Sequence, residues 1–173
     1  MSDAQEWPED TVPPGLPEGR LSGRYAFEET LRLALSVAGP LQLSPLVLCD
    51  DDFADWPLGE RSVIDSLNAW ATQGRHLRIL ALDYTRLREL HPRFVQWRTT
   101  WGHLVEARAC RHAAPGELPS ALWTPGWTFE RLDRTHGTAV ATTLAERRVA
   151  LQERIERWWA QASPAFPAST LGL

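Results

Sequence analysis

Three aspartates are the side chains with the clearest potential for chemistry in this chain. Asp50 and Asp52 follow an apolar run, residues 41–49, and Asp83 follows a second one, residues 76–82. If these runs form neighbouring parallel strands, the aspartates lie at the carboxyl ends of the strands, where open α/β sheets bind ligands. Hard carboxylates suit Mg²⁺, and a metal held there would activate water for phosphoester hydrolysis. Asp50, Asp52 and Asp83 are therefore our candidate ligand-binding residues.

The same aspartates also have an ordinary structural interpretation, because aspartate is common in turns and at helix caps. The sequence contains no further ligand motif and no glycine loop that could cradle a phosphate. Its histidines lack the spacing of metal ligands, and no serine lies in the G-x-S-x-G sequence of a nucleophile elbow. We therefore predict no metal site, no cofactor and no catalytic residue.

Positive charge is supplied by arginine alone, since the chain has eighteen arginines and no lysine. This excludes phosphate loops and Schiff-base enzymes, which need a lysine. Residues 1–60 carry a net charge of −9 and residues 61–173 a net charge of +5. Nucleic-acid-binding domains are usually strongly basic, so this thin excess argues against nucleic acid as a partner. The opposing signal is a set of arginines and tryptophans in one segment: Arg93, Trp97, Arg98, Trp101, Arg108 and Arg111.

The elements that would position the aspartates follow from periodicity. Residues 1–22 are acidic and rich in proline, which predicts an extended or disordered arm before a single domain at residues 23–167 and a tail at residues 168–173. The apolar runs predict strands, separated by a helix whose inner face ends at Gly74 and whose start resembles a capping box from Ser62 to Asp65. Strand, helix and strand in this order predict a parallel crossover.

The rest of the chain continues the alternation of helices and strands. Pro92 should divide one helical segment into two, and residues 105–112 alternate as a half-exposed strand. Residues 120–142 predict strands that end in a hairpin near Asp133 to Gly137, and a long helix from Leu144 to Ala162 closes the domain. The expected fold class is α/β, with a mixed sheet and helices on both faces.

This order of elements resembles one lobe of the phospholipase D superfamily over about residues 24–166. When Asp133 is placed on the aspartate of the family motif HxKxxxxD, Gly126 stands at the histidine position and Thr128 at the lysine position. The family forms a phosphohistidine on that histidine, so the resemblance implies a degenerate lobe without this chemistry. Active members pair two lobes across a shared site, so a single lobe implies at most a homodimer.

Cellular context follows from composition. No apolar run is long enough to span a membrane, and the acidic first residues are unlike a signal peptide. Cys49 and Cys110 lie in runs typical of buried strands, which suits reduced thiols in the cytoplasm. The sequence thus favours a non-catalytic interaction or assembly module that forms a homodimer or binds another protein. The alternative is a metal-dependent phosphoesterase that uses Asp50, Asp52 and Asp83.

Overall fold

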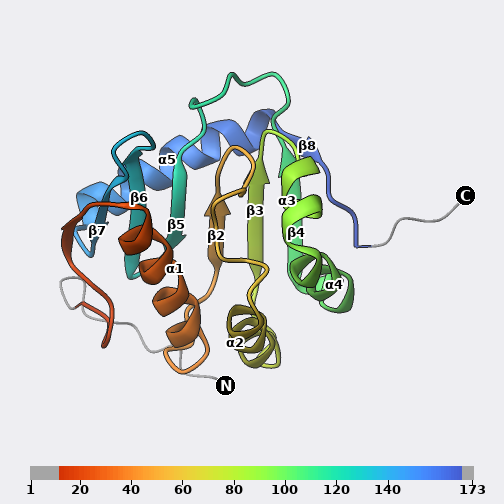
Figure 1. Cartoon of the computed structure of the whole chain (residues 1–173), viewed down its shortest axis with the longest axis horizontal. Coiled ribbons are helices and arrows are strands. Elements are labelled where there is room, and N and C mark those ends of the chain that lie inside the picture. Colours follow the sequence, from red (N-terminus) through yellow and green to blue (C-terminus); the bar gives the residue numbers. More distant parts are fainter. Residues whose placement is uncertain (1–11, 169–173) are drawn as a thin grey trace, which may run out of the picture.

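One eight-stranded mixed sheet organises the fold, with helices on both of its faces (Figure 1). The structure is a computed structural model, and it describes residues 12–168. Its elements, in chain order, are β1 (Gly19–Leu21), α1 (Arg24–Ala38), β2 (Leu46–Cys49), α2 (Arg61–Ala71), β3 (Leu77–Ala81), α3 (Thr85–Leu90), α4 (Pro92–Thr100), the 3-10 helix η1 (Gly102–Leu104), β4 (Val105–Ala109), β5 (Ser120–Thr124), β6 (Trp127–Asp133), β7 (Thr138–Thr142), α5 (Ala145–Gln161) and β8 (Ser163–Pro164).

The strands lie in the order β1-β7-β6-β5-β2-β3-β4-β8. The neighbouring strands β2, β3 and β4 run parallel, and all other neighbours pair antiparallel. The predicted crossover is confirmed, because α2 connects β2 to its parallel neighbour β3. The predicted hairpin is formed by β6 and β7. The α/β class with a mixed sheet is therefore observed, and it brings the ends of β2 and β3 side by side.

The two faces of the sheet have separate cores. Helices α1 to α4 cover one face, and their apolar residues pack with alternate strand residues such as Leu48, Ile79 and Phe129. Helix α5 lies behind the sheet in Figure 1 and packs through Leu151, Ile155 and Trp159 on the opposite face. Helices on both faces are thus confirmed. Within residues 12–168, no helix is long and apolar enough to cross a membrane.

Several expected boundaries can be compared with the observed ones. Pro92 begins α4 and separates it from α3, as predicted. The predicted capping box at Ser62 is wrong, because the N-cap of α2 is Glu60, two residues earlier, and the Glu60 carboxylate binds Arg32 at 2.6 Å. The last helix was expected to begin at Leu144, but Leu144 is the exposed N-cap and α5 begins at Ala145.

The first described residues contribute to the domain. The expected boundary between residues 22 and 23 falls after β1, which pairs with β7 at the edge of the sheet. Leu16 is buried, and the indole of Trp127 donates to the carbonyl of Pro17 at 2.9 Å. Residues 19–21 therefore belong to the sheet, and Leu16 and Pro17 pack against the domain, whereas residues 1–11 of the expected arm lie outside the described residues.

Candidate functional site

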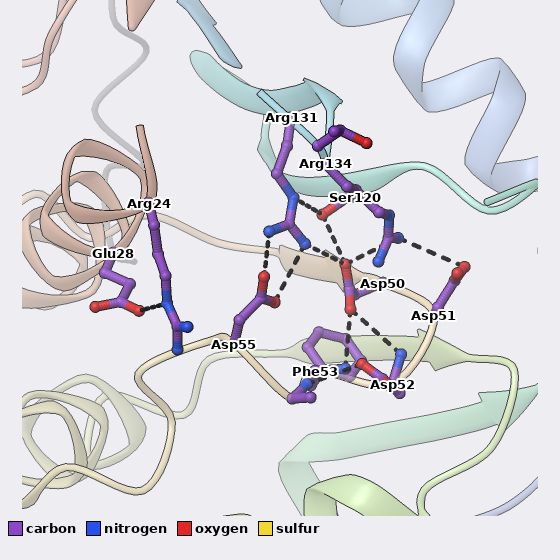
Figure 2. Close-up of polar contacts among 12 residues, drawn as sticks. Arg24, Glu28, Asp50, Asp51, Asp52, Phe53, Asp55, Ser120, Arg131 and Arg134 are labelled. Atoms are coloured by element: carbon purple, nitrogen blue, oxygen red, sulfur yellow. Dashed lines mark hydrogen bonds and ion pairs between the residues drawn. The ribbon is translucent and has the colours of Figure 1, made fainter. Parts of the chain in front are cut away.

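Asp50 lies at the carboxyl end of β2 and is completely buried. It continues the inward alternation of Leu48, so its carboxylate faces the side of the sheet that α1 and α2 cover. Its Oδ2 accepts the backbone N–H groups of Asp52 at 3.2 Å and Phe53 at 2.9 Å, which close the turn after the strand. Its Oδ1 accepts the hydroxyl of Ser120 at 2.6 Å (Figure 2).

Arg131 brings a positive charge to this carboxylate from β6. It is the cross-strand partner of Ser120 and faces the same side of the sheet, with only 5% of its side chain exposed. Its guanidinium donates to Asp50 Oδ1 at 3.3 Å and to both carboxylate oxygens of Asp55. Burial favours the neutral form of each partner, but the hydrogen bonds between them outweigh it, so the pKa of Arg131 is raised and the pKa of Asp55 is lowered.

Arg134 adds a second positive charge from the turn between β6 and β7. Its Nη2 lies 3.2 Å from Asp50 Oδ1 and 3.5 Å from Asp51 Oδ1 (Figure 2). The other oxygen of Asp51 accepts the Gly116 N–H at 2.8 Å. Burial raises the pKa of Asp51, and the Gly116 hydrogen bond and the charge of Arg134 oppose this effect. The cluster at the end of β2 is thus an internal network of aspartates and arginines.

The three predicted ligand-binding aspartates do not form a common site. Asp52 accepts the backbone N–H of Ala54 at 2.9 Å, and the exposed Asp83 accepts that of Thr85 at 2.9 Å where α3 begins. In the part of the chain that the structure describes, no group of three or more His, Cys, Asp or Glu side chains could hold a metal ion. The carboxylates close turns and bind arginines, which are the structural roles that their positions also allowed.

The positions of the phospholipase D motif carry strand and turn roles. Gly126 lies in the tight turn between β5 and β6, and Thr128 is buried opposite Thr142. Asp133 closes the β6–β7 turn, because its carboxylate accepts the N–H of Thr135 at 2.8 Å and lies 2.6 Å from Nδ1 of His136. The His136 hydrogen bond lowers the pKa of Asp133. Membership of the superfamily stays a prediction.

A groove between α2 and α4, which the sequence analysis did not identify, contains two arginines. It has a volume of about 300 Å³ and is lined by Arg61, Ile64, Asn68, Arg93, Gln96, Trp97 and Thr100. This lining contains no carboxylate among the described residues: α4 has no acidic residue at all, and Asp65, the one acidic residue of α2, does not line the groove. We call it the α2–α4 groove.

Its two arginines come together because the starts of α2 and α4 are packed closely. A methyl group on Gly59 would lie 3.0 Å from Nδ1 and 3.2 Å from Cα of His91 and 3.3 Å from the Leu90 carbonyl, so a larger residue would push these segments apart. Arg93 Nη1 donates to the Gly59 carbonyl at 3.1 Å. Within residues 12–168, neither Arg61 nor Arg93 forms an ion pair, although both are exposed.

The helix dipole disfavours arginine at these positions. Arg61 is the first residue of α2 and Arg93 the second residue of α4, and the first turn of neither helix contains an acidic residue. A positive charge at a helix N-terminus costs about 0.3–1 kcal/mol at an exposed site. The stability of the two helices therefore does not explain why arginines occupy these positions. Binding of an anion between Arg61 and Arg93 would explain it.

The structure separates the arginines and tryptophans that are neighbours in the sequence. Arg98 is buried and donates to the carbonyls of Phe166 and Gly102, and Trp97 is also buried. Arg108 packs over Trp159 on the α5 face of the sheet. Of this set, Arg93 and Trp97 line the α2–α4 groove; Arg61, Asn68 and Gln96 were missed by the sequence analysis. The available signal was the nine-residue helix PRFVQWRTT, which has no acidic residue and repeats polar side chains every three or four positions.

Comparison with known proteins identifies the fold of this chain but not its family. No protein-family model and no curated protein matches it. Among solved structures, it is similar to TrmBL2, described as an archaeal chromatin protein whose structure shows a novel mode of DNA binding. The match has a TM-score of 0.62 and 16% sequence identity, and it covers 90% of this chain and 57% of the TrmBL2 chain. It establishes a shared fold, over somewhat more than half the length of TrmBL2.

This likeness corrects the sequence-based expectations about function and partners. A DNA-binding chromatin protein of the same fold overturns the preferred interaction or assembly module, the alternative phosphoesterase built on Asp50, Asp52 and Asp83, and the argument against nucleic acid. The charge argument was wrong because it averaged over more than a hundred residues. In the folded chain the acidic residues gather elsewhere, on α1 and at the end of β2, and leave a local basic groove.

Proposed function

We propose that this chain is a DNA-binding domain that holds the phosphate backbone in the α2–α4 groove. The observation that carries the proposal is the groove itself, in which two exposed arginines, two amides and a hydroxyl meet with no carboxylate in the described lining. Arginine, amide and hydroxyl groups are the side chains that contact DNA phosphates and sugars. The shared fold with a DNA-binding chromatin protein supports the same class of ligand.

The electrostatics require such a local site. The chain has a net charge of −4, and double-stranded DNA carries one negative charge per ~1.7 Å of its axis. The protein as a whole therefore repels DNA, and attraction must come from a surface where the local field is positive. Arg61 and Arg93 provide two such charges at one end of the groove.

The test is the salt dependence of DNA binding by the double variant Arg61→Gln and Arg93→Gln. Each phosphate contact adds about −0.9 to the slope of log affinity against log salt for duplex DNA, so the double variant should flatten the slope by about 1.8. The affinity should fall about tenfold or more at low salt. Fluorescence anisotropy of a labelled duplex, measured between about 50 and 200 mM salt, gives both quantities.

The matched control is Arg147→Gln, which removes one exposed arginine from α5 on the opposite face of the sheet. It should change neither slope nor affinity beyond the general effect of one distant charge. Because each arginine costs about 0.3–1 kcal/mol at its helix N-terminus, the double variant should be as stable as the wild-type chain or more stable by up to about 2 kcal/mol. An equal loss in the control and the double variant would refute the assignment of the groove.

Two further parts of the proposal are structural and cellular. We propose that the domain is a degenerate lobe of the phospholipase D superfamily, supported by the order of its elements from α1 to α5. A cytoplasmic location is supported by its two buried free cysteines, Cys49 and Cys110.

A further inference from the structure

We infer that the end of the α2–α4 groove opposite the arginines is a stacking site for unpaired bases, formed by Trp101 and His103, so that the domain prefers single-stranded to duplex DNA. The inference rests on the proposed function and names the form of DNA that the same groove takes. It is carried by the position, exposure and fixed orientation of one tryptophan.

Trp101 differs from most tryptophans of the domain in its exposure. Residues 12–168 contain eight tryptophans, and six of them are buried: Trp56, Trp70, Trp97, Trp123, Trp127 and Trp159. Trp101 and Trp158 keep part of their rings accessible. Trp101 is the C-cap of α4 and packs against the core as a partly buried residue, so part of its ring stays accessible to a base.

A residue of the groove fixes the indole. Trp101 Nε1 donates to the side-chain oxygen of Asn68 at 3.0 Å, and Asn68 lines the α2–α4 groove. This hydrogen bond is formed at the edge of the ring and leaves its face available for stacking. A ring that is already oriented loses less conformational freedom when a base binds.

His103 provides a second ring at the same end. It is exposed, and its ring centre lies 6.1 Å from that of Trp101 at an angle of 42°. The two rings therefore border a common space without stacking on each other. Nucleic-acid-binding proteins use such aromatic side chains, next to a basic groove, to bind unpaired bases of any sequence.

The distance along α4 fits a short strand. Eight residues separate Arg93 from Trp101, and a rise of 1.5 Å per residue places them about 12 Å apart along the helix. A few nucleotides cover this distance at the ~3.4 Å spacing of a stacked strand. Phosphates can thus bind the arginines while a base of the same strand stacks on Trp101. A duplex keeps its bases paired and cannot use this end of the groove.

The experiment compares a labelled dT oligonucleotide with a hairpin duplex of the same number of nucleotides, for the wild-type chain and for Trp101→Leu and His103→Ala. The wild-type chain should bind the dT strand more tightly than the duplex. Trp101→Leu should weaken binding to the dT strand about tenfold and leave duplex binding nearly unchanged. His103 is exposed, so His103→Ala cannot disturb the core and should give a smaller loss in the same direction.

The matched control is Trp158→Leu. Trp158 is also partly exposed and lies 6.3 Å from the ring of His112 at 48°, but it belongs to α5 on the other face of the sheet. The Trp158→Leu substitution should not change the affinity for the dT strand or for the duplex. A loss in Trp158→Leu instead of Trp101→Leu, or equal losses for strand and duplex in Trp101→Leu, would overturn the inference while the arginine variants still test the proposed function. Failure of the wild-type chain to bind any DNA would overturn both.

Discussion

At the scale of single residues, the aspartates show how position can be predicted while role cannot. The sequence places Asp50 at the carboxyl end of a central strand, and the structure agrees. Its partners, Arg131 and Arg134, lie about eighty residues later and reach it only because β5 and β6 insert beside β2. No local sequence pattern predicts that these arginines pair with Asp50. In the sequence, aspartates whose charge is balanced by distant arginines therefore looked like metal ligands.

Asp55 provides a test of this network, because its lowered pKa makes its contribution dependent on pH. A carboxyl whose folded pKa is depressed stabilises the fold above its unfolded pKa of about 3.9, and this stability is lost as the pH falls through the lower folded pKa. Asp55→Asn should therefore reduce the free energy of unfolding by about 1.5–3 kcal/mol at pH 7. Urea melts at decreasing pH should show the wild-type and variant curves converging below about pH 4.

Asp51 is the matched comparison because its pKa is shifted in the opposite direction. Burial raises its pKa, so its ionised form is a cost to folding once the pH rises through the raised value. Asn can still accept the Gly116 N–H. Asp51→Asn should consequently leave stability at pH 7 unchanged or slightly increased. A loss in Asp51→Asn as large as in Asp55→Asn would show that the two carboxylates act as one unit.

At the scale of elements, periodicity predicted the helices and the crossover but not the groove. The apolar residues of α2 and α4, among them Leu67 and Phe94, recur at helical spacing and pack on the sheet as expected. The solvent-facing residues of α2 and α4 follow no comparable spacing from which the groove could be predicted. Arg61 and Arg93 line one groove because the segment at Gly59 lies close to His91 and accepts a hydrogen bond from Arg93, a contact between segments about thirty residues apart that neither helix encodes alone.

Helix α5 allows a prediction from packing. Trp159 anchors this helix, because it is buried and its ring lies 4.6 Å from the guanidinium carbon of Arg108. Trp159→Ala should destabilise the fold by about 3–5 kcal/mol in urea melts. Trp158→Ala, at a partly exposed position, should cost clearly less, and the exposed control Arg147→Ala should stay within about 0.5 kcal/mol. Similar curves for Trp158→Ala and Trp159→Ala would contradict this packing.

At the scale of the whole molecule, a C-terminal strap connects the two faces of the sheet. We define the strap as residues 163–168: β8 pairs with Arg108 and Ala109 at the edge of β4, and Phe166 then enters the core under α3 and α4. The strap covers the last edge of the sheet, which would otherwise present unpaired backbone groups. A strand of two residues is too short to show an alternating pattern, so the sequence predicted only that the preceding helix ends near Ala162.

Phe166 is the residue through which the strap holds the α4 region. It is buried, stacks on Tyr84 with ring centres 4.9 Å apart, and accepts a hydrogen bond from Arg98 of α4 at 3.2 Å through its carbonyl. Phe166→Ala should remove about 3–5 kcal/mol of stability. Because the contacts lie on one side of the molecule, hydrogen exchange should accelerate first in α4 and β4.

The pattern of that exchange distinguishes local from global coupling. β1 and β7 lie at the other end of the sheet order from the strap, so their protection should fall only as far as the global stability falls. Phe166→Leu keeps most of the buried volume and should restore much of the protection in α4. If all strands lost protection equally in Phe166→Ala, the strap would be part of one cooperative unit, and the groove beside α4 could not loosen independently of the sheet.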